Sequence, residues 1–207
     1  MTTTDQLKAT ILEQLKTQEL IRLPASEEEF FALSAQLPFK IEYHESEIVT
    51  MGLASYWHEV LIMTLGGIFY NLFSSKKDFT VSGSNTGVKI PKFEGGHYLP
   101  DIVVVKGAPE FKSGSTAVIL NPYIVVEVLS PSTNDFDLSE KLPDYKLIES
   151  LQQVIFVSQK KRMVSSYTRS EQPGVWLNQD FFEGDTILIE EMPVALRDVY
   201  DKVQFAK

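Results

Sequence analysis

Tyr123-Ile-Val-Val-Glu-Val-Leu129 is the stretch that decides the fold. Apart from Glu127, its residues are aliphatic, β-branched or aromatic at both odd and even positions. This pattern is typical of a central β-strand that is covered on both faces of its sheet. An unpaired charge buried there would cost on the order of several kcal/mol. We therefore expect Glu127 to have a cationic partner, a bound metal or a shifted pKa.

A second apolar run, Ile102-Val-Val-Val105, is entered by the pair Pro100-Asp101. An acid at the mouth of one apolar strand and an acid inside the next can together hold a divalent metal, because Mg²⁺ prefers hard oxygen ligands. The sequence therefore predicts a Mg²⁺ site at Asp101 and Glu127, with Mn²⁺ as a possible substitute. Two simpler interpretations remain open. Asp101 could merely begin its strand, and Glu127 could form a structural ion pair with Lys141.

The length and composition fit one α/β domain with an extension. The chain has 207 residues, of which 43% are hydrophobic and 23% charged. We expect a helical N-terminal lead-in over residues 1–38 and the main domain over residues 39–207. The absence of cysteine excludes disulfides and thiolate metal sites. No stretch has the length of a membrane span and no secretion signal is evident, so a cytoplasmic protein without membrane contact is expected.

Apolar periodicity and turn residues indicate the order of the elements. Helices are expected near residues 4–20, 26–37, 55–73 and 138–148, the second starting with the capping-box pattern Ser26-Glu-Glu-Glu29 and the third capped by Ser55. A hairpin is expected at 40–51, and strands at 79–82, 88–90, 99–105, 123–129, 154–157 and 163–167, with short strands or turns after Pro173. The fold class predicted is α/β, with a central mixed β-sheet flanked by helices.

The helix after Glu127 offers a cation to the predicted site. Leu129, the next residue on the face of Glu127, can neither transfer protons nor steady a negative charge. Beyond a turn over residues 130–133, Asp137, Lys141 and Tyr145 recur at a spacing of four and share one helical face. If this face points at the sheet, Lys141 can bring its ammonium to the site and stabilise charge on a phosphate.

These features resemble the PD-(D/E)XK nuclease superfamily, which has the restriction-endonuclease fold. More closely, the chain resembles a large bacterial family of restriction-endonuclease-like proteins that is abundant in photosynthetic bacteria. The resemblance covers roughly residues 27–170. The matching segments are Pro100–Val105, Val125–Thr133, the face of Asp137, Lys141 and Tyr145, the hairpin with Glu42 and the helix with His58.

The resemblance implies roles for individual residues. Asp101 and Glu127 would be metal ligands, and Lys141 would replace the lysine that most of the superfamily carries two residues after the second acid. His58 would lie near the attacking water or the substrate phosphate, and Glu42 would support the site. The implied activity is Mg²⁺-dependent hydrolysis of phosphodiester bonds in nucleic acid, with DNA as the expected substrate. A homodimer is expected by analogy with restriction-like enzymes.

Three features favour an alternative of another class. The net charge is −9, with 19 basic against 28 acidic residues, whereas nucleic-acid binders usually carry basic excess. No lysine stands two residues after Glu127, and residues 152–158 carry amides and a serine where relatives tend to have a segment ending in an acid. The alternative is a catalytically inactive interaction or regulatory module, or a structural dimer whose acidic pocket binds metal without turnover.

Several residues near the predicted site also have simpler interpretations. His58 could be a packing residue at the edge of an amphipathic helix. Tyr145 could be a core residue whose hydroxyl is hydrogen-bonded, and Asp137 could be the i, i+4 partner of Lys141. The basic turn Lys160-Lys-Arg162 could contact phosphates, but such turns are usually solvated.

Overall fold

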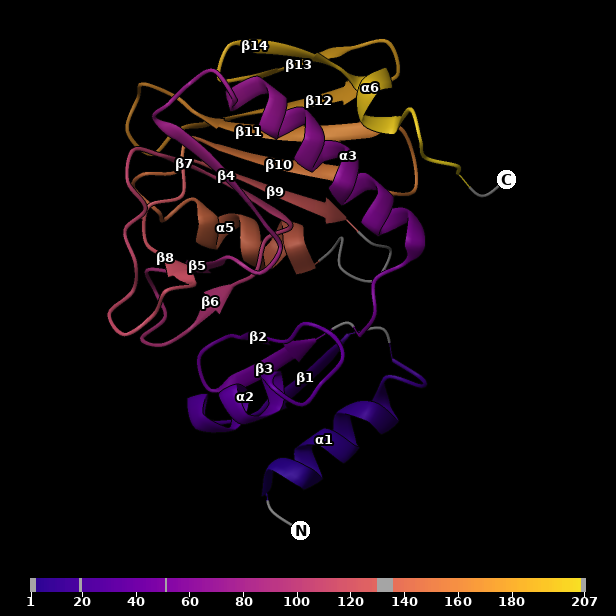
Figure 1. Ribbon diagram of the computed structural model, residues 1–207, viewed down its shortest axis with the longest axis vertical. Helices are drawn as coiled ribbons and strands as arrows, with labels where there is room; N and C mark the ends of the chain where they lie inside the picture. The colour runs from indigo at the N-terminus through magenta and orange to yellow at the C-terminus, as the bar shows by residue number, and fades with distance from the viewer. Residues whose placement is uncertain (1–2, 19, 51, 130–135, 206–207) are drawn as a thin grey trace.

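The long apolar strands build one of two six-stranded sheets in the computed structural model, which describes residues 3–18, 20–50, 52–129 and 136–205 (Figure 1). We call it sheet B. Its strand order is β12-β11-β10-β9-β7-β4, and it is mixed because β9 and β10 are parallel while the other neighbours are antiparallel. Its strands are β4 (Phe79–Gly83), β7 (Ile102–Lys106), β9 (Ile124–Leu129), β10 (Gln153–Ser158), β11 (Met163–Arg169) and β12 (Trp176–Phe182).

One face of sheet B is covered by a long helix and a C-terminal layer (Figure 1). The helix α3 (Tyr56–Phe73) begins as predicted at Ser55, whose hydroxyl accepts the His58 N–H at 3.2 Å. Leu61, Leu65 and Phe69, spaced by four, are buried against the sheet. The rest of this layer consists of β13 (Thr186–Ile189), β14 (Met192–Ala195) and α6 (Leu196–Tyr200).

The opposite face of sheet B packs against a short helical segment rather than the full helix predicted over 138–148. This segment is a π-helical turn, η1 (Asp137–Lys141), followed by α5 (Leu142–Tyr145). In η1 the Leu142 N–H donates to the Asp137 carbonyl, five residues back. Pro143 has no N–H for an α-helical bond in the next turn, which favours such a wide turn and an early helix end.

A second sheet, sheet A, departs from the single central sheet that the sequence predicts, although its hairpin and its strand near residues 88–90 are expected. Its order is β1-β3-β2-β6-β5-β8, and β5 and β8 are parallel. The predicted hairpin at 40–51 is present as β2 and β3, with a turn at His44–Ser46 in which Glu45 and Ser46 have positive φ. The strands are β1 (Ile21–Pro24), β2 (Glu42–Tyr43), β3 (Glu47–Thr50), β5 (Gly87–Lys89), β6 (His97–Tyr98) and β8 (Val118–Ile119).

The first 38 residues contribute a strand as well as two helices. The helices are α1 (Thr3–Gln14) and α2 (Glu27–Ser34), and the capping box predicted at Ser26 and Glu29 is present at the start of α2. Between them, β1 pairs with β3 from Ile21↔Thr50 to Pro24↔Glu47. These elements share a hydrophobic cluster and lie at the end of the molecule opposite β13 and β14 (Figure 1). No helix in the described ranges is long and apolar enough to cross a membrane.

Candidate active site

Asp101 lies on the link that carries the chain from β6 of sheet A into β7 of sheet B. Its N–H donates to the Val126 carbonyl at 3.1 Å, and its Oδ2 accepts the Val128 N–H at 2.8 Å. These two bonds fix the carboxylate against β9. The strand that follows Asp101, β7, pairs with β9, as the sequence predicts. Burial alone would raise the pKa of Asp101, but His58, Lys40 and the Val128 N–H hold it below its ordinary value.

Glu127 projects from β9 on the face that it shares with Val125 and Leu129, toward η1 and α5. Its Oε1 accepts hydrogen bonds from Lys141 Nζ at 3.2 Å and from Tyr145 Oη at 2.7 Å. Burial raises the pKa of Glu127 to about 8, since the carboxylates of Asp137, Asp101 and Glu42 add repulsion and Lys141 offsets only part of the cost. The sequence predicts that a buried Glu127 needs a cationic partner, a bound metal or a shifted pKa. The structure shows a cationic partner, Lys141, together with a raised pKa.

Glu42 reaches the same ammonium from sheet A. Its Oε1 accepts from Lys141 Nζ at 3.1 Å and from the Leu99 N–H at 2.8 Å, and its Oε2 lies 2.8 Å from His44 Nε2. Burial works against the charged form here too. However, Lys141, His44 and the Leu99 N–H together hold the pKa of Glu42 well below its ordinary value. Glu42 is thus a buried, ionised carboxylate with both oxygens engaged.

Lys141 is the cation at the centre of these contacts. Its side chain is 3% exposed, and its Nζ lies 3.1 Å from Glu42, 3.2 Å from Glu127 and 3.5 Å from Asp137 Oδ1. Burial lowers its pKa, but the three carboxylates overcome this and raise the pKa of Lys141 well above its usual value. The side chain therefore remains an ammonium. The Asp137 pairing and the Tyr145 hydroxyl bond expected from the helix spacing are both present.

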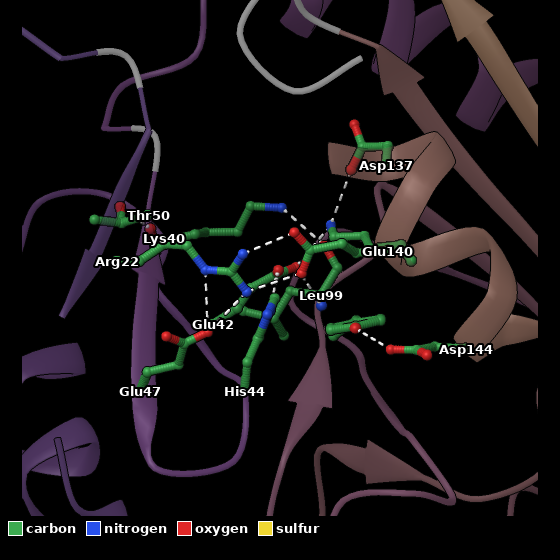
Figure 2. Close-up of polar contacts among 12 residues, drawn as sticks. Arg22, Lys40, Glu42, His44, Glu47, Thr50, Leu99, Asp137, Glu140 and Asp144 are labelled. Atoms are coloured by element: carbon green, nitrogen blue, oxygen red, sulfur yellow. Dashed lines mark hydrogen bonds and ion pairs between the residues drawn. The ribbon is translucent and has the colours of Figure 1, made fainter. Parts of the chain in front are cut away.

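All five predicted site residues line one pocket of about 840 Å³. Glu42 comes from β2, His58 from α3, Asp101 from the start of β7, Glu127 from β9 and Lys141 from η1. His58 Nε2 lies 3.6 Å from Asp101 Oδ1, which places the first turn of α3 at the pocket. Figure 2 shows Lys40, Glu42 and His44 converging on this region with Leu99 and Asp137.

The comparison with protein families shows which family the chain belongs to. A family model described as "Uma2: Putative restriction endonuclease" matches residues 27–198, which include all five residues. The chain belongs to the Uma2 family. Two relatives of Synechocystis sp. (strain PCC 6803) are the "Uncharacterized protein sll1609", 27% identical over 68% of this chain and 78% of its own length, and the "Uncharacterized protein slr1290", 28% identical over 81% and 85%.

A solved structure has the same fold. It is the crystal structure of "a putative nuclease belonging to DUF820" from Anabaena variabilis ATCC 29413, with a TM-score of 0.65 and 15% identity. The match covers 86% of this chain and 98% of the other. The α/β, restriction-endonuclease-like fold class predicted from the sequence is therefore confirmed, with the addition of sheet A.

The carboxylates of this Uma2 chain fit a divalent cation. Among the described residues, no group of three or more His, Asp or Glu side chains is gathered as a closed metal cage. Mg²⁺ does not require one, because it is commonly held by one or two carboxylates and keeps several waters. Both protein hydrogen bonds of Glu127 end on Oε1, and burial is the main cause that raises its pKa. Asp101 and Glu127 are thus chemically suited to hold Mg²⁺ or Mn²⁺.

Sequence reasoning missed two residues that contact the site. Lys40 Nζ lies 3.7 Å from Asp101 Oδ1, and His44 contacts Glu42. Lys40, Glu42 and His44 are spaced by two, so the alternation of side chains along a strand could have placed all three on one face. A further contact, between Arg22 and Glu140, joins residues 118 positions apart and left no local signal in the sequence.

Other predicted features lie away from the site or outside the described residues. The turn predicted over residues 130–133 lies outside the described residues. Within residues 152–158, Gln153–Ser158 form β10. There the Gln153 Nε2 donates to Ser166 Oγ and to the Leu188 carbonyl, so its amide has a structural role. In the basic turn, Arg162 pairs with Glu183.

Proposed function

We propose that this Uma2 protein is a metal-dependent nuclease that hydrolyses phosphodiester bonds in DNA. The observation that carries the proposal is the arrangement of two carboxylates in one pocket, with the buried ammonium of Lys141 beside the second. Asp101 directly precedes β7, and Glu127 lies on the adjacent strand β9. Membership of a family whose description is "Putative restriction endonuclease" supports the reaction class. DNA as the substrate, and Mg²⁺ or Mn²⁺ as the cofactor, are parts of the proposal.

Asp101 and Glu127 would hold the cation, whose chemistry is to acidify water and to neutralise charge on the phosphate. The chain's own residues supply the rest. Lys141, kept as an ammonium by three carboxylates, would offset the charge that develops on the phosphate. Glu42 would hold Lys141 in place through the 3.1 Å contact. His58, within 3.6 Å of Asp101, would help to position that carboxylate.

Cleavage of plasmid and oligonucleotide DNA tests the proposal. Wild type with Mg²⁺ or Mn²⁺ should cut, while addition of EDTA should abolish cutting. Asp101→Asn should lose most of the cutting activity, because one carboxylate ligand is lost. The matched control is Asp201→Asn, since Asp201 is exposed and pairs with Lys202 at the surface. Cutting that persists in Asp101→Asn would contradict the assignment.

One observation favours a second candidate, a catalytically inactive binding module. Lys141 is already paired with Glu42, Glu127 and Asp137, and the chain carries a net charge of −9. A cation so neutralised would attract a phosphate weakly. Metal binding by the wild type without any cutting, over a range of single- and double-stranded DNA, would favour this second function.

We also propose a homodimer, because an enzyme that cuts both strands of a duplex commonly presents two active sites. Light scattering coupled to gel filtration should give twice the mass of 23.4 kDa. A monomer at concentrations where cleavage is measured would contradict this part of the proposal.

A further inference from the structure

Arg22 on β1 forms a bidentate ion pair with Glu140 in η1. Its Nη1 donates to Glu140 Oε1 at 2.7 Å and its Nη2 donates to Glu140 Oε2 at 2.9 Å. Its Nε donates to Glu47 Oε1 on β3 at 3.0 Å. Figure 2 shows the guanidinium between these two acids. Two parallel hydrogen bonds between planar groups fix direction as well as distance.

The pairing reaches Lys141 by two routes. Glu140 directly precedes Lys141 in the same π-helical turn. In addition, the Arg22 guanidinium carbon lies 5.3 Å from the centre of the Phe136 ring, and Lys141 Nζ lies 5.7 Å from the centre of the same ring. Arg22 therefore contacts both the residue before Lys141 and an aromatic side chain beside the ammonium.

The described part of the helical segment that carries Lys141 is short. Its η1 turn has five residues and its α5 has four, and no side-chain hydrogen bond caps the start of either of them. Helices of this length have little stability of their own, so tertiary contacts decide where they lie. The Arg22–Glu140 pair is a contact of this kind.

We propose that Arg22 is a positioning residue for Lys141, so that the N-terminal strand β1 completes the candidate site. The expected effect of Arg22 on turnover rests on the nuclease function proposed above, whereas its expected effect on the position of Lys141 does not. Arg22 lies before residues 27–198, which the family model matches. The proposed role of Arg22 is therefore argued from the structure of this chain alone. The side chains of Arg22 and Glu140 are 36% and 43% exposed, and exposed ion pairs contribute little to global stability. The effect of removing the pair should therefore fall on Lys141 rather than on the unfolding midpoint.

Chemical labelling of Lys141 in the metal-free protein gives a readout that does not depend on activity. In wild type the amine is buried, so acylation by a soluble ester should be slow relative to the exposed Lys161. In Arg22→Gln and in Glu140→Gln the Lys141 rate should rise by a factor of about five or more, because the turn is released. The double variant should show no further rise, since both changes remove the same interaction.

Glu47→Gln is the matched control. It removes the other acid that contacts Arg22 but leaves the bond to η1, so Lys141 labelling should stay at the wild-type rate. Arg22→Lys should give an intermediate rate, because a lysine cannot form the two-pronged contact. In turnover assays, kcat should fall by about tenfold in Arg22→Gln and Glu140→Gln, with a smaller change in KM.

Two results would overturn the proposal. One is a rate of Lys141 labelling in both Arg22→Gln and Glu140→Gln that equals the wild-type rate. The other is an equal rise in Glu47→Gln, which would mean a general loosening of the N-terminal strands. If the wild type cuts no DNA but the labelling pattern is as expected, the positioning role stands and the proposed nuclease function fails.

Discussion

The two sheets contribute to the candidate site in opposite ways. Sheet B has strands of five to seven residues and two apolar faces, and it fixes Asp101 and Glu127 through backbone pairing. Sheet A has strands of two to four residues, and its contribution is Glu42, whose oxygens are engaged by Lys141, Leu99 and His44. The regular sheet thus places the two carboxylates that we propose as metal ligands, while the minor sheet contributes Glu42 to the ammonium beside them.

The same contrast appears in the two glutamates that share Lys141. Glu42 and Glu127 lie at nearly equal distances from Nζ, 3.1 and 3.2 Å. Yet the pKa of Glu42 is lowered and that of Glu127 is raised to about 8. The difference arises because Glu42 accepts a backbone N–H and contacts His44, whereas Glu127 faces further carboxylates. Sheet A therefore carries the ionised partner of the lysine.

Removing the shared cation should have the largest effect on both sheets. Lys141→Met would leave Glu42, Glu127 and Asp137 buried without their common ammonium. We expect a loss of about 3–5 kcal/mol in the free energy of unfolding, measured by urea denaturation. Lys161→Met, at an exposed position, should leave it unchanged. An unaltered midpoint in Lys141→Met would show that the lysine does not hold the two sheets together.

Matched core substitutions test whether the two sheets unfold together. Leu33 in α2 is buried among the N-terminal elements, and Leu65 in α3 is buried against sheet B. Leu33→Ala and Leu65→Ala should each cost about 3 kcal/mol, because each leaves a cavity. A single transition that shifts in both variants is expected from circular dichroism on heating. Two transitions, of which Leu33→Ala moves one, would instead show that the N-terminal elements unfold independently.

The two glutamates should respond to pH with opposite signs. The folded pKa of Glu127, about 8, lies above its ordinary 4.5, so its contribution to stability is present below pH 4.5 and is lost as pH rises through 8. As pH rises from 5 to 8.5, the free energy of unfolding of Glu127→Gln should therefore increase relative to that of wild type, by about 2 kcal/mol. The groups facing Glu127 are Lys141, Tyr145, Asp137, Asp101 and Glu42.

Glu42 provides the reverse case. Its folded pKa is depressed, so its contribution is present above pH 4.5 and is lost as pH falls through the folded value. Glu42→Gln should be less stable than wild type at pH 7 by about 2 kcal/mol, and the difference should shrink on acidification. Urea unfolding at several pH values measures both variants. Parallel pH curves for the two would contradict the assigned difference between the sheets.

The smallest expected effects concern the serine caps of the two helices. Ser26 caps α2 beside sheet A, and Ser55 caps α3 on sheet B. Ser26→Ala and Ser55→Ala should each lower stability by about 1 kcal/mol, measured by thermal denaturation. Ser34→Ala, at the C-terminal end of α2, is the control and should cost less. A loss of stability well above about 1 kcal/mol in either cap variant would indicate that the serine does more than cap its helix.

Sheet B could be predicted from the sequence because its signals are local. The runs around Val104 and Val126 are apolar at both parities, which marks strands covered on both faces. The spacing of Asp137, Lys141 and Tyr145 placed the lysine beside Glu127, although the segment proved to be a π-helical turn rather than a regular helix. Local patterns therefore predict Asp101, Glu127 and Lys141, whereas Glu42 and His58 follow only from the family resemblance.

The hairpin β2–β3 and the strand β5 are expected from the sequence, but their assembly into sheet A could not be predicted, for a physical reason. Strands of two to four residues are too short to show a period, and their stability comes from distant partners. The pairing of Val88 with Ile119 and that of Ile21 with Thr50 are examples. The Arg22–Glu140 contact is likewise decided by how separate elements pack, not by any local pattern.

Calorimetric titration with Mn²⁺ tests the central claim most directly, namely that sheet B holds the metal while sheet A holds the lysine. The account predicts that wild type and Glu42→Gln bind one Mn²⁺ per chain, whereas Asp101→Asn and Glu127→Gln lose most of the affinity. Undiminished binding by Asp101→Asn, together with its loss in Glu42→Gln, would contradict the account.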